Sequence, residues 1–236
     1  MSMNKSVISV LGIPVHLAEN YLEQVKHMAG GHIVTLNTEM VMLARKNQDL
    51  ASIITKADLV VPDGAGVVLY GGYRGHKIHR CPGIELAAEM LNLAQQESLP
   101  VFFVGASPEV LTRMVDHWQK QLPNLPIVGA ENGYFDEITE QQILTKISAS
   151  KPRFIFVALG VPKQELWIAQ HRSVCPDAIW MGVGGSFDVW AGVKQRAPQW
   201  MGKIHLEWLF RLMQEPWRWR RMLVLPQFVW QVLWES

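Results

Sequence analysis

The sequence predicts an α/β fold: a largely parallel sheet covered by helices on both faces, followed by a helical C-terminal appendage. Strand-like runs alternate with helical segments along most of the chain, and this alternation is typical of a parallel sheet. Several runs are apolar throughout, which indicates strands buried on both faces; residues 100–105 and 154–160 are examples. A length of 236 residues fits one large domain with an appendage.

The first third of the chain is expected to form three strands and three helices. Gly12 and Pro14 should end the first strand, and Asn37 or Thr38 should cap the helix after the second strand. The strands are expected at residues 6–11, 32–36 and 58–61, and the helices at 19–28, 38–46 and 50–56.

The middle of the chain continues the alternation. Residues 70–75 are glycine-rich and are expected to form a connection, as are residues 133–135. Ser107 is expected to cap a helix that has Pro108 at its first position. Further strands are expected at residues 100–105, 127–130, 154–160 and 178–184, and further helices at 83–94, 108–122, 140–149 and 162–172.

The C-terminal segment differs in composition from the rest. Six of the ten tryptophans lie in the last 38 residues, so we place a boundary near Pro198, between a core of residues 1–198 and an appendage of residues 199–236. Interleaved Trp and Arg beside apolar runs fit a membrane interface. The alternative is a helix pair packed on the core or on another subunit of a homo-oligomer.

The overall composition argues against several classes of protein. The formal net charge of +1 gives no argument for nucleic-acid binding. The two cysteines, Cys81 and Cys175, are too few for a disulfide scaffold and fit a reduced, cytosolic compartment. The start of the chain lacks a signal peptide's apolar core, and no apolar run reaches the roughly 18 residues of a spanning helix.

Polar and glycine-rich clusters follow five of the expected strands. They are Asn37 with Thr38, Asp63, residues 105–107, residues 160–165 and residues 182–188. In a parallel sheet these turns share one edge, where helix N-termini suit phosphate groups. We therefore expect a nucleotide or sugar-phosphate cleft; the alternative is that the turns only supply the glycines and caps that such folds need.

Asp63 is the first candidate for a working carboxylate. It follows an apolar strand and Pro62, and Gly64 and Gly66 beside it are expected to let the backbone turn and a ligand come close. The alternative is an ordinary Pro-Asp-Gly turn. Arg80 precedes a rigid turn and could bind a phosphate or carboxylate, or be an exposed loop arginine.

Formal cofactor motifs are absent from the sequence. Leu69 stands where the third glycine of G-x-G-x-x-G would be, and there is no P-loop, which argues against an NAD-dependent oxidoreductase and an ATPase. His76 and His79 lack ligand partners at metal spacing, and no D-x-D pair is present. We therefore expect neither a metal nor a cofactor.

An ordered set of motifs resembles the WecG/TagA/CpsF glycosyltransferases, glycosyltransferase family 26. The set spans about residues 35 to 222. Its members are residues 36–39, 62–67, 80–86, 103–106, 133–135, 158–165, 182–188, 196–198 and 206–211.

The resemblance implies a Rossmann-like fold of the GT-E type and an inverting, metal-independent transferase. Such enzymes move N-acetylmannosamine, or its uronic acid, from UDP onto a lipid-diphosphate-linked N-acetylglucosamine, for teichoic acid or surface polysaccharide. The appendage would complete the site at the inner face of the plasma membrane. The alternative function is a non-catalytic nucleotide-sugar binding module that docks on a biosynthetic complex.

The resemblance also assigns roles to residues. Asp63 is the expected catalytic base and Arg80 the expected catalytic cation near the substrate. Thr38 and Gln164 resemble sugar or acceptor contacts. The other expected substrate-binding residues are Asn37, Gly105, Lys163, Glu165, Gly184, Gly185, Asp188 and, in the appendage, Arg211, Arg218 and Arg221.

Overall fold

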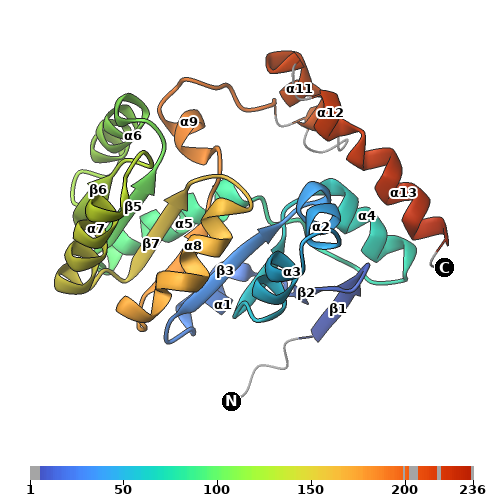
Figure 1. Cartoon of the computed structure of the whole chain (residues 1–236), viewed down its shortest axis with the longest axis horizontal. Helices are drawn as coiled ribbons and strands as arrows, with labels where there is room; N and C mark the ends of the chain where they lie inside the picture. The colour runs from blue at the N-terminus through green and yellow to red at the C-terminus, as the bar shows by residue number, and fades with distance from the viewer. Residues whose placement is uncertain (1–5, 199, 202–206, 217–218, 235–236) are drawn as a thin grey trace.

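A six-stranded sheet forms the centre of the fold, and all five of its strand pairings are parallel, as predicted. The computed structural model describes residues 6–198, 200–201, 207–216 and 219–234 (Figure 1). Across the sheet the strands are β4 (Leu59–Pro62), β3 (Gly31–Leu36), β8 (Ile179–Gly182), β7 (Phe154–Ala158), β5 (Val101–Gly105) and β6 (Ile127–Glu131).

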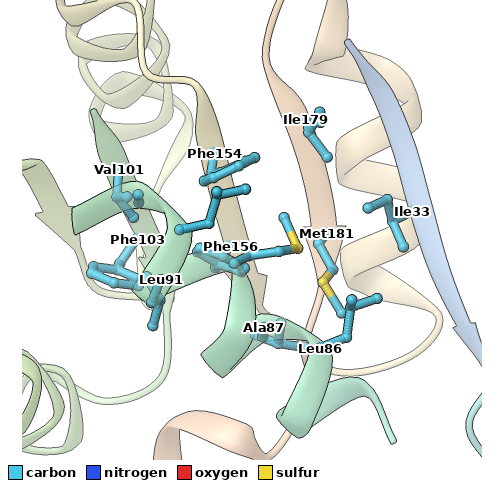
Figure 2. Close-up of a cluster of buried hydrophobic side chains, with 14 of the residues drawn as sticks. Ile33, Leu86, Ala87, Leu91, Val101, Phe103, Phe154, Phe156, Ile179 and Met181 are labelled. Carbon is cyan, nitrogen blue, oxygen red and sulfur yellow. The ribbon is translucent and has the colours of Figure 1, made fainter. Parts of the chain in front are cut away.

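Helices cover both faces of this sheet (Figure 1). Because side chains alternate along a strand, Phe154 and Phe156 of β7 enter one core while Ile155 enters another. The first core, part of which Figure 2 shows, packs α1 (Tyr21–Lys26), α5 (Gly83–Gln96), α6 (Pro108–Gln121) and α9 (Ser186–Trp190). The opposite face carries α2 (Thr38–Ala44), α3 (Gln48–Thr55), α4 (Ala65–Tyr73), α7 (Glu137–Ser150) and α8 (Lys163–His171), which a short 3-10 helix (Arg172–Val174) follows.

Side-chain caps begin several helices where the sequence predicts them. Asn37 accepts a hydrogen bond from the Met40 backbone at 2.9 Å, so Asn37 is the cap of α2 and Thr38 its first residue. Ser107 caps α6 through the Val110 N–H, and Pro108 follows it, as expected. These caps set the points at which the chain leaves the sheet edge and enters a helix.

Two features of the chain differ from the prediction. Pro14 lies inside β2 (Ile13–Leu17), which forms an antiparallel hairpin with β1 (Ser6–Val10). Proline is tolerated there because both strands of a two-stranded sheet are edge strands. The glycine-rich residues 70–73 belong to α4, where a Cβ on Gly71 would lie 2.0 Å from Ile78 Cδ1. That glycine therefore serves close packing and not a loop.

The C-terminal helices are α11 (Glu207–Gln214), α12 (Trp219–Met222) and α13 (Val224–Trp234), at the upper right of Figure 1. One face of α13 packs on the core cluster to which α2 and α4 contribute, through residues spaced four apart: Val224, Phe228 and Val232. Phe228 is only 4% exposed. Trp230 and Trp234 on the same helix are exposed. Within the described part of the chain, no helix has the length and apolarity needed to cross a membrane.

Phe228→Ala is expected to release α13 without unfolding the sheet. The ring of Phe228 meets Tyr70 at 6.3 Å between centroids, and deleting a buried aromatic side chain costs about 3–5 kcal/mol. Hydrogen exchange should accelerate in α13 and stay slow in β3, β5 and β7. The matched control is Val229→Ala, because Val229 is 56% exposed and should leave exchange unchanged. Equal exchange in α13 of both variants would contradict this docking.

Candidate active site

Asp63 is held at the carboxyl edge of the sheet by the end of the neighbouring strand. In the β3–β4 pairing Leu36 is opposite Pro62, so Asn37 and Asp63 leave the sheet side by side. The backbone N–H groups of Asp63 and Gly64 both donate to the Leu36 carbonyl, at 3.0 and 3.2 Å. Ligands of parallel α/β folds bind at this edge, outside the strand ends.

The segment after α4 also holds Asp63. The carboxylate oxygen Oδ1 of Asp63 accepts a hydrogen bond from the Gly83 backbone N–H at 3.1 Å, at the first turn of α5. Arg80 Nε donates to the Asp63 carbonyl at 2.7 Å. The Asp63 carboxylate is therefore bonded to a residue twenty positions further along the chain. It lies at the N-terminus of α5, whose partial positive charge favours a negative group.

The two glycines beside Asp63 have a different role from the one expected. Gly64 has an ordinary φ of −79°, so no unusual turn requires glycine there. A Cβ on Gly64 would lie 2.8 Å from Asn37 Cα, and one on Gly66 would lie 2.3 Å from Thr38 Oγ1. The glycines therefore let α4 begin directly against the start of α2, which keeps Asp63 next to Asn37.

Two cavities meet at Asp63. The larger, about 540 Å³, follows the ends of β3, β4, β7 and β8, and its size is typical of a small-molecule site. The smaller, about 130 Å³, lies between the starts of α2 and α4 and the C-terminal helices. Asn37, Glu39, Asp63 and Glu207 line both cavities. A group bound in either cavity therefore lies beside Asp63.

The structure gathers most of the expected site residues around these cavities. Thr38 and Arg80 line the smaller one. Asn37 and Asp63 line both, and the larger one is also lined by Gln164, Gly184, Gly185 and Asp188. Four of the five clusters predicted to share the sheet edge thus contribute to one cavity.

Other expected residues lie elsewhere. Gly105, Lys163 and Glu165 line neither cavity. Gly105 ends β5, which β7 separates from β8, and Lys163 Nζ lies 5.4 Å from the Phe135 ring centre. Arg218 lies outside the described residues; Arg211 and Arg221 belong to α11 and α12, where their side chains are not described.

Five charged residues at the cavities were not among the expected site residues: Glu39, Lys194, Arg196, Glu207 and Glu215. Lys194 Nζ lies 3.1 Å from Asp188 Oδ2 and 3.3 Å from Glu215 Oε1, so it links the loop after α9 to the end of α11. Glu39, Arg196 and Glu207 had a signal in the sequence, because they lie in the motifs at residues 36–39, 196–198 and 206–211.

Glu207 brings α11 into the site through Arg80. Arg80 Nη2 and Glu207 Oε2 are 2.5 Å apart, and both side chains are mostly buried. Trp208 and Leu212 of the same helix line the smaller cavity. Arg80 therefore joins three parts of the site: the Asp63 backbone, α11 and the wall of the smaller cavity.

Cys81, which follows Arg80, is not suited to be a nucleophile. Burial, together with the nearby Asp63 carboxylate, raises the pKa of the Cys81 thiol to about 12, so it stays protonated at neutral pH. The described residues contain no group of three or more His, Cys, Asp or Glu side chains that could hold a metal ion.

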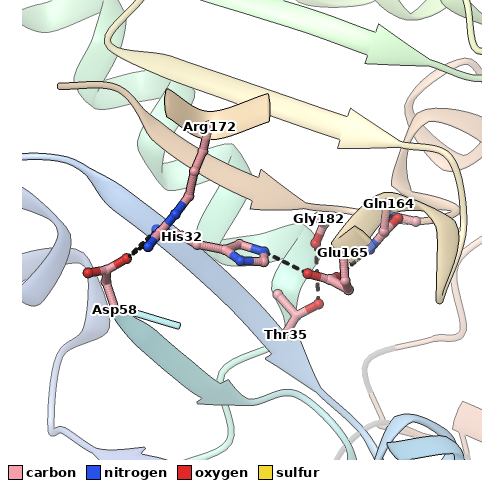
Figure 3. Close-up of polar contacts among 8 residues, drawn as sticks. His32, Thr35, Asp58, Gln164, Glu165, Arg172 and Gly182 are labelled. Carbon is pink, nitrogen blue, oxygen red and sulfur yellow. Dashed lines mark hydrogen bonds and ion pairs between the residues drawn. The ribbon is translucent and has the colours of Figure 1, made fainter. Parts of the chain in front are cut away.

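Gln164 connects the larger cavity to the buried pair of Glu165 and His32 (Figure 3). Its Oε1 accepts the Gly184 backbone N–H at 3.1 Å, and its Nε2 donates to Glu165 Oε1 at 2.9 Å. The second carboxylate oxygen of Glu165 lies 2.7 Å from His32 Nε2. One side chain of the cavity wall is therefore held from beneath by two buried residues.

The chain is similar to known transferases over nearly its whole length. A family model described as "Glycosyl transferase WecG/TagA/CpsF family" matches residues 8–236. A protein of Bacillus spizizenii is 39% identical over 219 residues, which are 92% of this chain and 83% of that relative. A protein of Bacillus subtilis is 35% identical over 222 residues, which are 94% of this chain and 85% of that relative. Both relatives are named N-acetylglucosaminyldiphosphoundecaprenol N-acetyl-beta-D-mannosaminyltransferase.

Gly66→Ala is expected to lower the free energy of unfolding by about 1–3 kcal/mol, because the new methyl group would overlap Thr38 Oγ1. Gly72→Ala is the matched control on the same helix. A Cβ there meets nothing within 4 Å, so this variant should be more stable by about 0.5–1 kcal/mol through helix propensity. Urea unfolding measures both. A Gly66→Ala variant as stable as Gly72→Ala would show that α4 does not press on α2.

Proposed function

The chain belongs to the WecG/TagA/CpsF family of glycosyl transferases, as the sequence motifs predict, and we propose that it transfers N-acetylmannosamine from UDP to a polyprenyl-diphosphate-linked N-acetylglucosamine. The names of the two Bacillus relatives support this acceptor and this transferred sugar. A uronic acid of the same sugar is the alternative donor residue. The product would enter teichoic acid or another cell-surface polysaccharide.

The observation that carries the proposal is the position of Asp63 on the wall shared by the two cavities. In our proposal the UDP-sugar occupies the larger cavity and the acceptor sugar enters from the smaller one. The larger cavity has room for a nucleotide sugar. The smaller one is lined by apolar side chains of the C-terminal helices, among them Trp208, Leu212 and Val224, which suit an acceptor that carries a lipid.

An inverting reaction needs a single in-line displacement at the anomeric carbon. The acceptor hydroxyl attacks from the face opposite to UDP, the new C–O bond forms, and the bond to the diphosphate breaks. Asp63 would take the hydroxyl proton as attack proceeds. An ordinary aspartate is ionised at neutral pH, so this base needs no unusual environment.

The departing diphosphate gains negative charge, which cationic groups must stabilise. In our proposal Lys194 and Arg196 stabilise this charge from the wall of the larger cavity, and Arg80 stabilises it from the smaller cavity, where the two cavities meet. Arg211, Arg218 and Arg221 would contribute positive charge from the appendage. The N-terminus of α2 adds backbone N–H groups at the same edge. We propose that the reaction proceeds by these groups, without a metal ion.

We also propose that residues 199–236 form an appendage that meets the inner face of the membrane, where a lipid-linked acceptor would lie. The exposed side chains of Trp230, Leu233 and Trp234 on α13 support this contact. The opposite side of that helix packs on the core through Phe228, so docking and membrane contact use different faces. Another subunit is the alternative cover for the exposed face.

Asp63→Asn is expected to lower transfer by about 10²–10⁴-fold, because asparagine keeps the bond to Gly83 but cannot take a proton. Transfer is measured with UDP-N-acetylmannosamine and a polyprenyl-diphosphate N-acetylglucosamine acceptor. UDP binding, measured by calorimetry, should stay within a few-fold of the wild type.

The matched control is Asp136→Asn, which changes another backbone-capping aspartate that lines neither cavity. It should transfer at the wild-type rate. An unimpaired Asp63→Asn variant would remove Asp63 as the base. A wild-type protein that binds UDP tightly and transfers to no acceptor would support the binding-module alternative.

A further inference from the structure

We propose that Glu165 is a positioning residue: it determines which way the Gln164 side-chain amide faces and, through Gln164, where Gly184 lies in the wall of the larger cavity. This inference rests on the proposed function for its kinetic consequence, but its structural part does not. It also gives a role to Glu165, which is fully buried and lines neither cavity.

The carboxylate of Glu165 sits where water cannot reach it. Glu165 is 0% exposed, and His32, which contacts it from β3, is 2% exposed. A buried carboxylate is strongly disfavoured unless hydrogen bonds replace those it made to water. Here the replacements are His32 Nε2 at 2.7 Å and Gln164 Nε2 at 2.9 Å.

This carboxylate selects one orientation of the Gln164 amide. Glu165 Oε1 accepts a hydrogen bond at 2.9 Å, so the group of Gln164 that faces it is the amide NH₂. The Gln164 oxygen then faces the other way and accepts the Gly184 N–H at 3.1 Å. Reversing the amide would set oxygen against carboxylate and NH₂ against N–H, which loses both bonds.

A glycine in β8 leaves room for the side chains of Gln164 and Glu165. A Cβ on Gly182 of β8 would lie 2.4 Å from Gln164 Nε2 and 2.5 Å from Glu165 Oε1, so only glycine leaves room there. Thr35 of β3 donates its hydroxyl to the Gly182 carbonyl at 3.4 Å (Figure 3). The network thus ties β3, α8 and β8 together directly under the cavity.

The consequence for the cavity follows from the position of Gly184. This residue has a φ of +50° and begins the turn from β8 into α9, and Gly185, Ser186 and Asp188 of the same segment line the larger cavity. Losing the bond from Gln164 would release this wall. Asp63 is held from β3 and α5, and Arg80 is held by the Asp63 carbonyl and by Glu207 of α11, so both would keep their geometry. Donor binding should therefore weaken more than the chemical step.

The test is the double variant His32→Phe with Glu165→Met, because replacing both members of a buried pair by apolar side chains of similar size preserves folding better than removing one. We expect the melting temperature to stay near the wild-type value. The Gly184 amide should exchange faster and shift in an ¹⁵N–¹H spectrum. The KM for the UDP-sugar should rise about five- to tenfold, the equivalent of one lost hydrogen bond, with kcat changed less.

Two further variants keep the inference falsifiable. Glu165→Met alone also removes the acceptor but leaves His32 without its partner, so it should melt at a lower temperature than the double variant while its Gly184 amide and its KM change in the same direction. His32→Gln keeps a donor for the carboxylate and leaves Glu165 in place, so both the Gly184 amide and the KM should match the wild type.

The outcomes separate the two proposals. An unchanged Gly184 amide and an unchanged KM in a folded variant lacking the carboxylate would overturn the positioning role, as would a His32→Gln variant with the full defect. A wild-type protein that does not bind UDP would instead overturn the proposed function, and the Gly184 amide would still report on Glu165.

Discussion

The Leu36 carbonyl receives the backbone N–H groups of both Asp63 and Gly64, and the candidate site depends on this junction between β3 and β4. It places Asp63 beside Asn37 at the sheet edge. Because Gly64 and Gly66 have no side chains, α4 can start against α2. On the other side, the Gly83 N–H at the start of α5 donates to the Asp63 carboxylate. Asp63 is thereby held by two backbone groups, the Leu36 carbonyl and the Gly83 N–H, and by the Arg80 side chain. Rigid support of this kind is what a catalytic group requires.

Much of the fold could be predicted from the sequence because its signals are local. Alternating apolar runs and helical spacing give the parallel sheet, and caps such as Asn37 and Ser107 mark helix starts. The hairpin strand with Pro14 and the helix with Gly71 were missed, since their proline and glycines are tolerated only through edge pairing and a close contact with Ile78.

The candidate site was only partly predictable, because local sequence patterns do not determine the order of the strands in the sheet. All strand ends share one edge, but β5 lies beyond β7, so Gly105 ends away from the cavities that Asp63 and Gln164 line. Lys194 and Glu207 reach the site from a loop and from α11 through tertiary packing. Glu165 was expected to bind substrate from its motif position, but it is fully buried under the cavity wall, where it accepts a hydrogen bond from Gln164.

The central claim is that Asp63 accepts the proton of the attacking hydroxyl, and the most direct measurement is a distance in a crystal structure of the protein with a UDP-sugar analogue and an acceptor analogue. We expect the acceptor hydroxyl about 2.6–3.2 Å from the Asp63 carboxylate and about 3–3.5 Å from the anomeric carbon, opposite to the diphosphate. A complex in which the hydroxyl meets Glu39 or Glu207 and lies beyond hydrogen-bond reach of Asp63 would contradict it.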